Sequence, residues 1–131
     1  MSATEQGEFA SFARWTFVSM GDGRSEVSWT PGPDMANPVG NVHGGLVATI
    51  VDEVAAMAVI SAIDRKSSVP TVSLHVDFLH GIAIGATYRA LGEVVRVGRA
   101  VAVADARILD ADDRVLARGT CIFQLPRTPP E

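Results

Sequence analysis

A long, mostly apolar segment behind two glycines constrains this 131-residue chain more than any other feature. The segment Gly44–Ile63 predicts a helix of about 20 residues, roughly 30 Å long. Because apolar residues cover nearly every face of it, we expect other parts of the fold to wrap around it. Two carboxylates, Asp52 and Glu53, interrupt the segment, and burying a carboxylate is costly. The chain is therefore predicted to fold around one long helix that carries an acidic group near its middle.

The rest of the chain predicts strands. Two apolar stretches between Phe9 and Thr30 flank a turn at residues 21–24, and the first stretch begins helically near Phe9–Phe12. After the long helix and a surface turn at residues 64–68, four more strands follow. One helix and an antiparallel sheet of about five to six strands form an α+β fold, in which the sheet curls around the helix. The four later strands are expected at 71–79, 87–97, 100–109 and 115–125.

Length, charge and cysteine content limit the classes of function. The 131 residues indicate one domain spanning 1–131, with loose tails at about 1–8 and 126–131. The net charge of −4, without a basic run, argues against nucleic acid as a partner. The long apolar segment is too charged for a membrane span, and no signal peptide is recognisable, so we expect a cytoplasmic protein.

No metal or other cofactor is expected. Cys121 stands alone and is predicted to be a small core residue. His75 and His80 lie five positions apart on a predicted strand, and hence on opposite faces of it, so they do not form a metal pair.

The His43-Gly44-Gly45 turn at the start of the helix is the strongest indication of chemistry. Glycines weaken a helix, so two at its beginning indicate that something approaches the backbone closely. The first amide groups of a helix lack partners and carry the positive end of the dipole, so Gly44 N–H can polarise a carbonyl oxygen. Asn37 and His43 can orient a water molecule or that carbonyl. Both side chains also have a purely structural explanation: Asn37 can bridge backbone groups of a turn, and His43 can bond a backbone carbonyl.

Asp52 can act as a general base on water or attack directly as a nucleophile. Thr71, at the start of the next strand, can hydrogen-bond the carboxylate or its water. His43 and Asp52 lie nine positions apart, which on one helix separates them by about 13 Å and by half a turn. We therefore expect a homodimer in which His43 and Gly44 of one chain face Asp52 of the other. Glu53, turned by about 100° from Asp52, is expected at an interface or in solvent.

The spacing Asn37-x-x-Gly40-x-x-His43-Gly44-Gly45, followed by Asp52 in a helix, resembles the hotdog-fold acyl-CoA thioesterases. The likeness is to the phenylacetate-pathway (PaaI-like) type within the 4-hydroxybenzoyl-CoA thioesterase superfamily, and it covers roughly residues 27–125. It implies a homodimer that pairs again into a homotetramer.

For the residues, the resemblance implies that Asp52 is the catalytic carboxylate and Gly44 the oxyanion donor. Asn37 and His43 would then place water and thioester, and Thr71 would support the acid. Gly45 and Phe78 would lie near the substrate. The turn Arg96-Val97-Gly98-Arg99 would contact the nucleotide of CoA, which is part of the substrate rather than a cofactor. His80-Gly81 departs from the proline-containing turn of many relatives.

The sequence thus predicts an acyl-CoA thioesterase that hydrolyses aromatic or medium-chain acyl-CoA. Two alternatives stay open: a hotdog hydratase or dehydratase acting on acyl thioesters, and a non-catalytic acyl-CoA-binding module. The sequence also leaves open whether Asp52 is nucleophile or general base, because both need a carboxylate at the same place.

Overall fold

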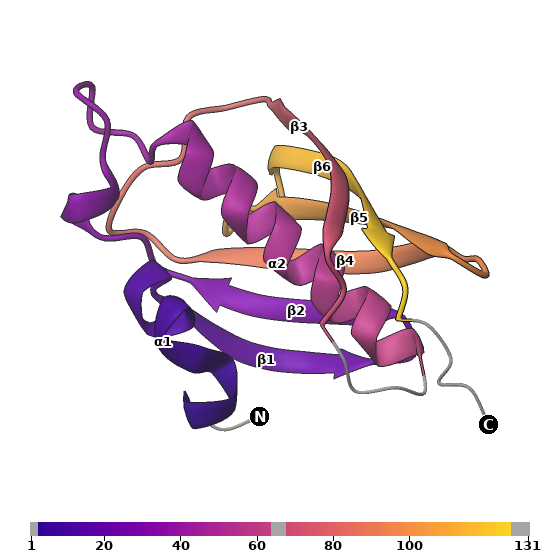
Figure 1. The fold of residues 1–131 in the computed structure, drawn as a ribbon. Coiled ribbons are helices and arrows are strands. Elements are labelled where there is room, and N and C mark those ends of the chain that lie inside the picture. The colour runs from indigo at the N-terminus through magenta and orange to yellow at the C-terminus, as the bar shows by residue number, and fades with distance from the viewer. Residues whose placement is uncertain (1–2, 64–67, 127–131) are drawn as a thin grey trace.

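The computed structural model describes residues 3–63 and 68–126, in which one long helix lies across a curled antiparallel sheet (Figure 1). A hairpin of two strands precedes that helix and four strands follow it, as expected. The elements are α1 (Ala3–Ala13), β1 (Trp15–Gly21), β2 (Arg24–Trp29), a 3₁₀ turn (Pro33–Met35), α2 (Gly44–Ala62), β3 (Thr71–Phe78), β4 (Tyr88–Val97), β5 (Val101–Leu109) and β6 (Val115–Gln124).

The six strands form one sheet in the order β1-β2-β4-β5-β6-β3, and every neighbouring pair is antiparallel. Short turns connect β1 to β2 and β4 to β5 to β6, so these hairpins build the sheet locally. The chain crosses over the sheet through α2 before β3, which pairs with β6 at the far edge. As a result β3 is an edge strand, with a free row of backbone groups along its outer side.

α2 packs closely against the sheet because small residues line the strands beneath it. A methyl group on Gly92 of β4 would lie 2.1 Å from the Val54 carbonyl oxygen of α2. Gly119 of β6 allows a similar approach beside Val51. The buried hydroxyl of Ser25 donates a hydrogen bond of 2.5 Å to the same Val54 carbonyl. By length and composition alone α2 could cross a membrane, but here it is the core helix of the sheet.

One side of α2 stays partly exposed, so the expectation of a helix wrapped on every side is only partly right. Residues on the buried side include Val51, Val54 and Ala55, all completely inaccessible. The other side retains solvent contact along a stripe made of Gly45, Thr49, Asp52, Ala56 and Ile60. The reason is the extent of the sheet, which ends at β3 and β1 and leaves that stripe uncovered within the chain.

The N-terminal part is more ordered than the sequence indicates. Residues expected as a loose tail belong to α1, which begins at Ala3 and bends at Gly7, where φ is +81°. Ala10 and Ala13 of α1 are buried, and the Trp29 indole donates a hydrogen bond of 2.8 Å to the Ala13 carbonyl, so α1 covers one end of the sheet. The expected surface turn at 64–68 and the tail at 126–131 fall largely outside the described residues.

Candidate functional site

The start of α2 presents one free amide. His43 is the N-cap, and its Nδ1 accepts a hydrogen bond of 3.3 Å from Gly45 N–H. An uncharged imidazole that accepts at Nδ1 carries its proton on Nε2, so the other edge of the His43 ring is a donor. Gly44 N–H has no partner among the described residues. The helix therefore offers an unpaired backbone donor at its positive end.

The loop before α2 is held by Asn37. The Asn37 Oδ1 accepts two backbone hydrogen bonds of 3.1 Å, from Val39 N–H and Asn41 N–H. Gly40 closes this loop with φ at +88°, a conformation that side chains disfavour. Because its oxygen is engaged, Asn37 has only its amide N–H groups free to meet a ligand.

Contacts among the described residues do not account for the two glycines at the start of α2. A methyl group on Gly44 would lie 3.5 Å from the Phe78 ring, an ordinary contact distance. A methyl group on Gly45 would meet only His43 Nδ1, at 3.6 Å. Neither residue has a positive φ. The chain's own packing would thus accept alanine at both positions.

Asp52 is paired with Thr71, as the sequence indicates. The Thr71 hydroxyl donates a hydrogen bond of 2.8 Å to Asp52 Oδ1. Asp52 lies on the partly exposed stripe of α2, and Thr71 is the first residue of the edge strand β3. This bond orients the carboxylate and leaves Asp52 Oδ2 without a partner among the described residues.

Two groups near Asp52, the carboxyl of Glu53 and the thiol of Cys121, have raised pKa values. Burial and then the Asp52 charge raise the pKa of Glu53 above its ordinary value. Burial, followed by the charges of Asp52 and Asp105, raises the pKa of the Cys121 thiol to about 12. Cys121 is fully buried, and a thiol with so high a pKa stays protonated, so it is a core residue and not a nucleophile.

The predicted residues fall into two half-sites at opposite ends of β3. One half-site contains Asn37, His43 and Gly44 beside Phe78, the last residue of β3. The other contains Asp52 and Thr71 at the first residue of β3. Gly44 and Asp52 are eight residues apart on α2, which is about 12 Å along the axis.

The expected separation by half a turn is wrong, because His43 precedes the first helical residue and does not follow the turns of α2. Gly44 and Asp52 in fact both face β3, and only the distance along the axis keeps them apart.

The first half-site opens into a pocket of about 320 Å³. Its floor is formed by buried apolar residues, and exposed residues that follow β3 form its wall. His80 lies in that wall, beyond the end of β3 rather than on the strand as expected. Sequence reasoning missed the floor, because no motif marks the contact between the segments around 42 and 82. The pocket is lined by Asn37, Asn41, Val42, Gly44, Val47, Phe78, Leu79, His80, Gly81 and Ile82.

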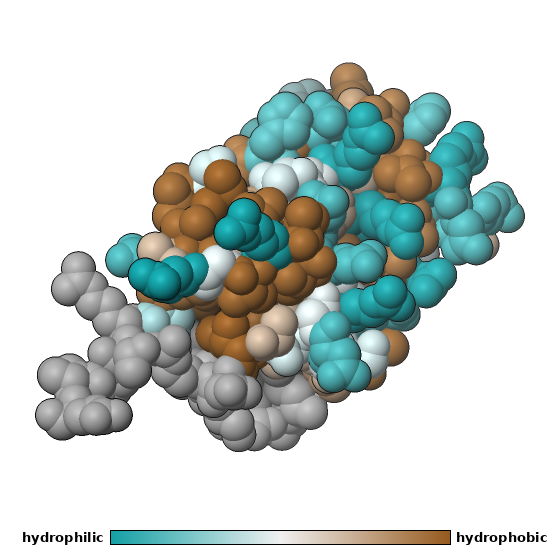
Figure 2. Space-filling view, turned by 90° about the vertical axis from the view of Figure 1, so that its right-hand side faces the viewer, coloured by the Kyte–Doolittle hydropathy of each residue, from teal (hydrophilic) through white to brown (hydrophobic). Residues whose placement is uncertain are grey.

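The turn Arg96–Arg99 lies at the tip of the β4–β5 hairpin, away from both half-sites along α2 (Figure 1). Arg96 and Arg99 are exposed and have no acidic partner among the described residues, whereas Arg14, Arg24 and Arg89 are each in an ion pair. Figure 2 shows apolar side chains gathered on the side of the molecule that carries this hairpin and β3. Exposed apolar residues of these elements are Val72, Leu74, Val95, Val97 and Val101.

Comparison with known proteins identifies the class. The sequence profile of the thioesterase superfamily matches residues 39–117, more than half of the chain. The chain therefore belongs to the thioesterase superfamily, and its curled sheet around one long helix is the hotdog fold. The resemblance drawn from the His-Gly-Gly and Asp52 spacing is thereby confirmed at the level of family and fold.

Individual relatives are distant. A Halobacterium salinarum protein named "Putative esterase" is 35% identical over 83 residues, which are 62% of this chain and 54% of that protein. The chain thus spans about half the length of this relative. The structure of a Mycobacterium tuberculosis protein of the same name covers 93% of this chain and 98% of its own, with a TM-score of 0.85 and 26% identity. A Streptococcus mutans protein solved with acetyl-CoA shares the fold at a TM-score of 0.80 and 23% identity, covering 90% and 94%.

Proposed function

We propose that this protein hydrolyses acyl-CoA thioesters in sites that two copies of the chain assemble together. The observation that carries the proposal is the position of the half-sites. The unpaired Gly44 N–H and the Asp52–Thr71 pair lie at opposite ends of one face of an edge strand whose outer side is free. A second copy that pairs antiparallel along this edge brings the beginning of its β3 next to the end of the first. The Gly44 half-site of each copy then faces the Asp52 half-site of the other copy, so one dimer contains two complete sites.

The surface of the edge supports such a pairing. Val72, Leu74 and Phe78 of β3 are 61%, 42% and 57% exposed, which is unusual for a strand of large apolar residues. The adjacent stripe of α2 is partly exposed as well. Exposed apolar surface of this extent marks an interface. A partner on this face would also occupy the space that the glycines at the start of α2 leave open.

In the assembled site the thioester carbonyl oxygen accepts a hydrogen bond from Gly44 N–H, which polarises the carbon. Asp52 of the partner subunit, oriented by Thr71, takes a proton from a water molecule whose oxygen adds to that carbon. The tetrahedral intermediate collapses, the C–S bond breaks, and the CoA thiolate receives the proton from Asp52. The products are a free acid and CoA.

Direct attack by Asp52 is the other route. It would form a mixed anhydride with release of the thiolate, and water would then hydrolyse the anhydride. A single turnover in ¹⁸O-labelled water tests for the anhydride. Label in the Asp52 carboxylate requires water to attack the Asp52 carboxyl carbon and identifies the nucleophilic route. A general base leaves label only in the product acid, as does an anhydride that water opens at the substrate's acyl carbon.

The CoA part of the substrate is supported by two observations. The S. mutans protein of the same fold was solved with acetyl-CoA. Arg96 and Arg99 are exposed cations without acidic partners, which suits the phosphates of a nucleotide. An aromatic or medium-chain acyl group, dimers that pair into a homotetramer and a location in the cytoplasm complete the proposal. These follow from the family resemblance and the composition.

Thiol release from a panel of acyl-CoA esters tests the activity. We expect Asp52→Asn to lower kcat by about 10²–10⁴-fold, the usual contribution of a positioned acid or base. The matched control is Glu53→Gln, which removes the neighbouring carboxylate and should retain activity. Thiol release that survives in Asp52→Asn would reject Asp52 as the catalytic carboxylate. Thiol release that is absent from the wild-type protein with every ester would reject the activity and leave a binding module.

Mixing two inactive variants tests whether the site is shared. Gly44→Pro removes the amide proton at the first helical position, where proline is tolerated. The preceding His43 already has φ −58° and ψ 134°, as a residue before proline requires. Gly44→Pro and Asp52→Asn chains should each be inactive alone. Unfolded and refolded together, they should regain activity, because each mixed dimer contains one intact site. No recovery in confirmed mixed dimers would mean that each site belongs to one chain.

A further inference from the structure

The pocket at the start of α2 has a rim that the proposed chemistry does not use. His80 and Gly81, which follow β3, form this rim. The backbone N–H groups of Leu79 and His80 donate hydrogen bonds of 2.9 and 3.0 Å to the Leu116 carbonyl of β6. These bonds fix the rim to the sheet, so the rim has a defined position beside the pocket.

Gly81 leaves room for the side chain of Asn41. A methyl group on Gly81 would lie 2.6 Å from Asn41 Nδ2 and 3.0 Å from the carbon of the same amide. Gly81 has no positive φ, so the backbone conformation does not require glycine at this position. The Asn41 amide therefore lies directly against the Gly81 backbone, in a space that any larger residue would occupy.

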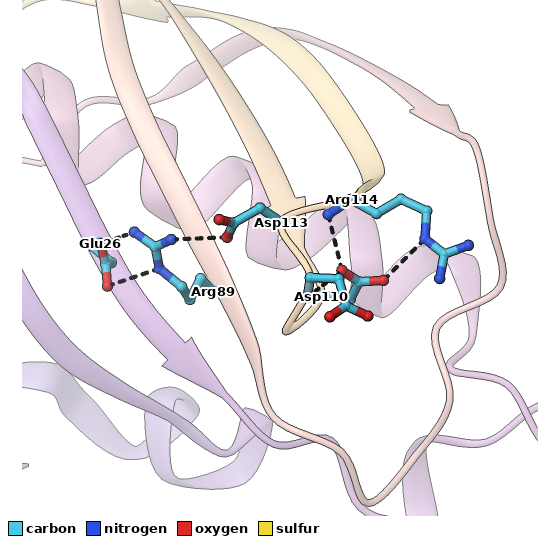
Figure 3. A network of polar contacts seen from close by, with 6 residues as sticks. Glu26, Arg89, Asp110, Asp113 and Arg114 are labelled. Atoms are coloured by element: carbon cyan, nitrogen blue, oxygen red, sulfur yellow. Dashed lines mark hydrogen bonds and ion pairs between the residues drawn. The ribbon is translucent and has the colours of Figure 1, made fainter.

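The Asn41 amide has no hydrogen-bond partner among the described residues, although the side chain is half-buried. Only the backbone of Asn41 is bonded, because its N–H donates to Asn37 Oδ1 and its carbonyl accepts a bond of 2.7 Å from Asn37 N–H. By contrast, the exposed Arg89 of β4 lies between Glu26 at 3.1 Å and Asp113 at 3.3 Å (Figure 3). An amide that is half-buried, held in place and unpaired is available to a ligand.

The pocket has donors at its rim and no acidic side chain among the described residues that line it. His80 is the single ionisable residue of that lining, and an imidazole is either neutral or positively charged. Asn41 Nδ2 and a ring N–H of His80 supply the donors, while the buried Val42 and Ile82 form an apolar floor. The volume of about 320 Å³ is at the small end for ligand pockets. The pocket therefore suits a short apolar chain that ends in a hydrogen-bond acceptor.

We propose that Asn41 and His80 select an acyl group that ends in a carboxylate, such as the adipyl group. The inference rests on the proposed thioester hydrolysis and names the acyl group for the same site. With the thioester carbonyl at Gly44 N–H, the acyl chain lies on the apolar floor and its carboxylate accepts hydrogen bonds from Asn41 Nδ2 and His80. A carboxylate offers only acceptors and meets no like charge in this lining. A methyl terminus would leave the Asn41 amide unpaired, and sites built to hydrogen-bond a group reject the analogue that lacks it.

Two esters of equal chain length test the selection. Adipyl-CoA and hexanoyl-CoA differ only at the far end of the acyl chain, which is a carboxylate in one and a methyl group in the other. The wild-type kcat/KM should be at least about 10-fold higher for adipyl-CoA, the smaller effect expected of a hydrogen bond to a charged group.

Three substitutions should lower this preference. Asn41→Leu keeps the size of the side chain but removes the amide, and His80→Leu removes the second donor. Gly81→Ala retains both donors and displaces the Asn41 amide, because the added methyl group would lie 2.6 Å from Nδ2. The matched control is His75→Leu. His75 is an exposed histidine of β3 that contacts Asp77 and lies outside the pocket, so the preference should stay at the wild-type value.

Two results would overturn the inference: equal kcat/KM for the two esters in the wild type, or a preference that survives in both Asn41→Leu and Gly81→Ala. Urea denaturation verifies that each variant is folded. Calorimetric binding of both esters to Asp52→Asn measures the preference without turnover and separates the two proposals. Tighter binding of adipyl-CoA, together with a wild type that releases no thiol, rejects the proposed activity alone. Thiol release that is equally fast from both esters rejects the selection alone.

Discussion

The middle and the beginning of α2 both depend on glycine, but for different reasons. At the middle, Gly92 and Gly119 belong to the sheet. A side chain on Gly92 would meet the Val54 carbonyl of α2, and one on Gly119 would meet the His75 carbonyl of β3 and the Val51 side chain of α2. At the beginning, Gly44 and Gly45 belong to the helix, and a methyl group there would make only ordinary contacts, with the rings of Phe78 and His43. Close packing among the described residues therefore explains the first pair and not the second. What requires the second pair lies outside the single chain, in a ligand or in another copy.

The largest change in stability is expected from a substitution beneath the middle of α2. Gly92→Ala places a methyl group against the Val54 carbonyl and next to the Ser25 hydroxyl, 2.1 and 2.5 Å away. α2 cannot move away from the sheet without breaking the hydrogen bond from Ser25 of β2 to the Val54 carbonyl of α2. The free energy of unfolding should fall by about 3 kcal/mol or more, the upper range for overpacking. Urea denaturation measures it, and a variant as stable as wild type would show that α2 is less closely packed than described.

A glycine-to-alanine substitution at the beginning of α2 should stabilise the fold instead of destabilising it. Gly45→Ala adds a methyl group where only His43 Nδ1 is near, at 3.6 Å, and alanine favours a helix over glycine. The free energy of unfolding should rise by up to about 1 kcal/mol.

The activity of Gly45→Ala should fall, although its stability rises. The methyl group protrudes where the substrate or partner approaches, and small misplacements in a site cost up to about 10²-fold in rate. Thiol release measures the expected loss of activity, and urea denaturation measures the expected gain in stability. Full activity in Gly45→Ala would remove the reason for distinguishing the two glycine pairs.

A smaller effect is expected at the Asp52 half-site. Thr71→Val keeps the shape and β propensity of the residue but removes the hydrogen bond of 2.8 Å to Asp52. A single hydrogen bond contributes about 0.5–1.5 kcal/mol, so kcat should fall by roughly 2- to 10-fold with little change in KM. Thr71→Ser, which retains the hydroxyl, is the control and should keep most of the activity. Equal losses in both variants would point to packing of the edge strand.

Sequence patterns sufficed for the features that local chemistry determines. The strand boundaries follow from alternation and from turns such as Asp22-Gly23, where both φ values are positive. The limits of α2 follow from the His-Gly-Gly turn and from the apolar run. The hydrogen bond between Thr71 and Asp52 confirms the prediction made from the position of Thr71 at the start of the strand that follows α2.

Other features depend on long-range contacts that no single segment encodes. The helical start near Phe9–Phe12 is confirmed, but the helix at Ala3–Ala13 begins earlier, within the residues predicted as a loose tail. The pocket at the start of α2 needs the segments around 42 and 82 to meet, which only the finished sheet brings about.

The smallest expected effect concerns Glu53, which neighbours Asp52 but faces away from β3. Burial and the Asp52 charge raise the pKa of Glu53 in the folded protein. An acid whose folded pKa exceeds its unfolded value destabilises the fold when ionised, so its contribution is lost as the pH rises through the folded pKa. Glu53→Gln should therefore be more stable than wild type near neutral pH and equally stable in acid below the ordinary pKa of 4.5.

Urea denaturation across this pH range measures the difference in unfolding free energy between Glu53→Gln and the wild type. The same comparison is repeated in the Asp52→Asn background. Removing the Asp52 charge eliminates one of the two causes, so the benefit of Glu53→Gln should shrink in the Asp52→Asn background but not vanish, because burial remains. A benefit that is independent of pH would show that Glu53 is solvated in the assembled protein. In that case the dimer interface would not extend over α2 as far as Glu53. The two α2 helices of a dimer would then have to stay far enough apart for water to reach the Glu53 carboxylate.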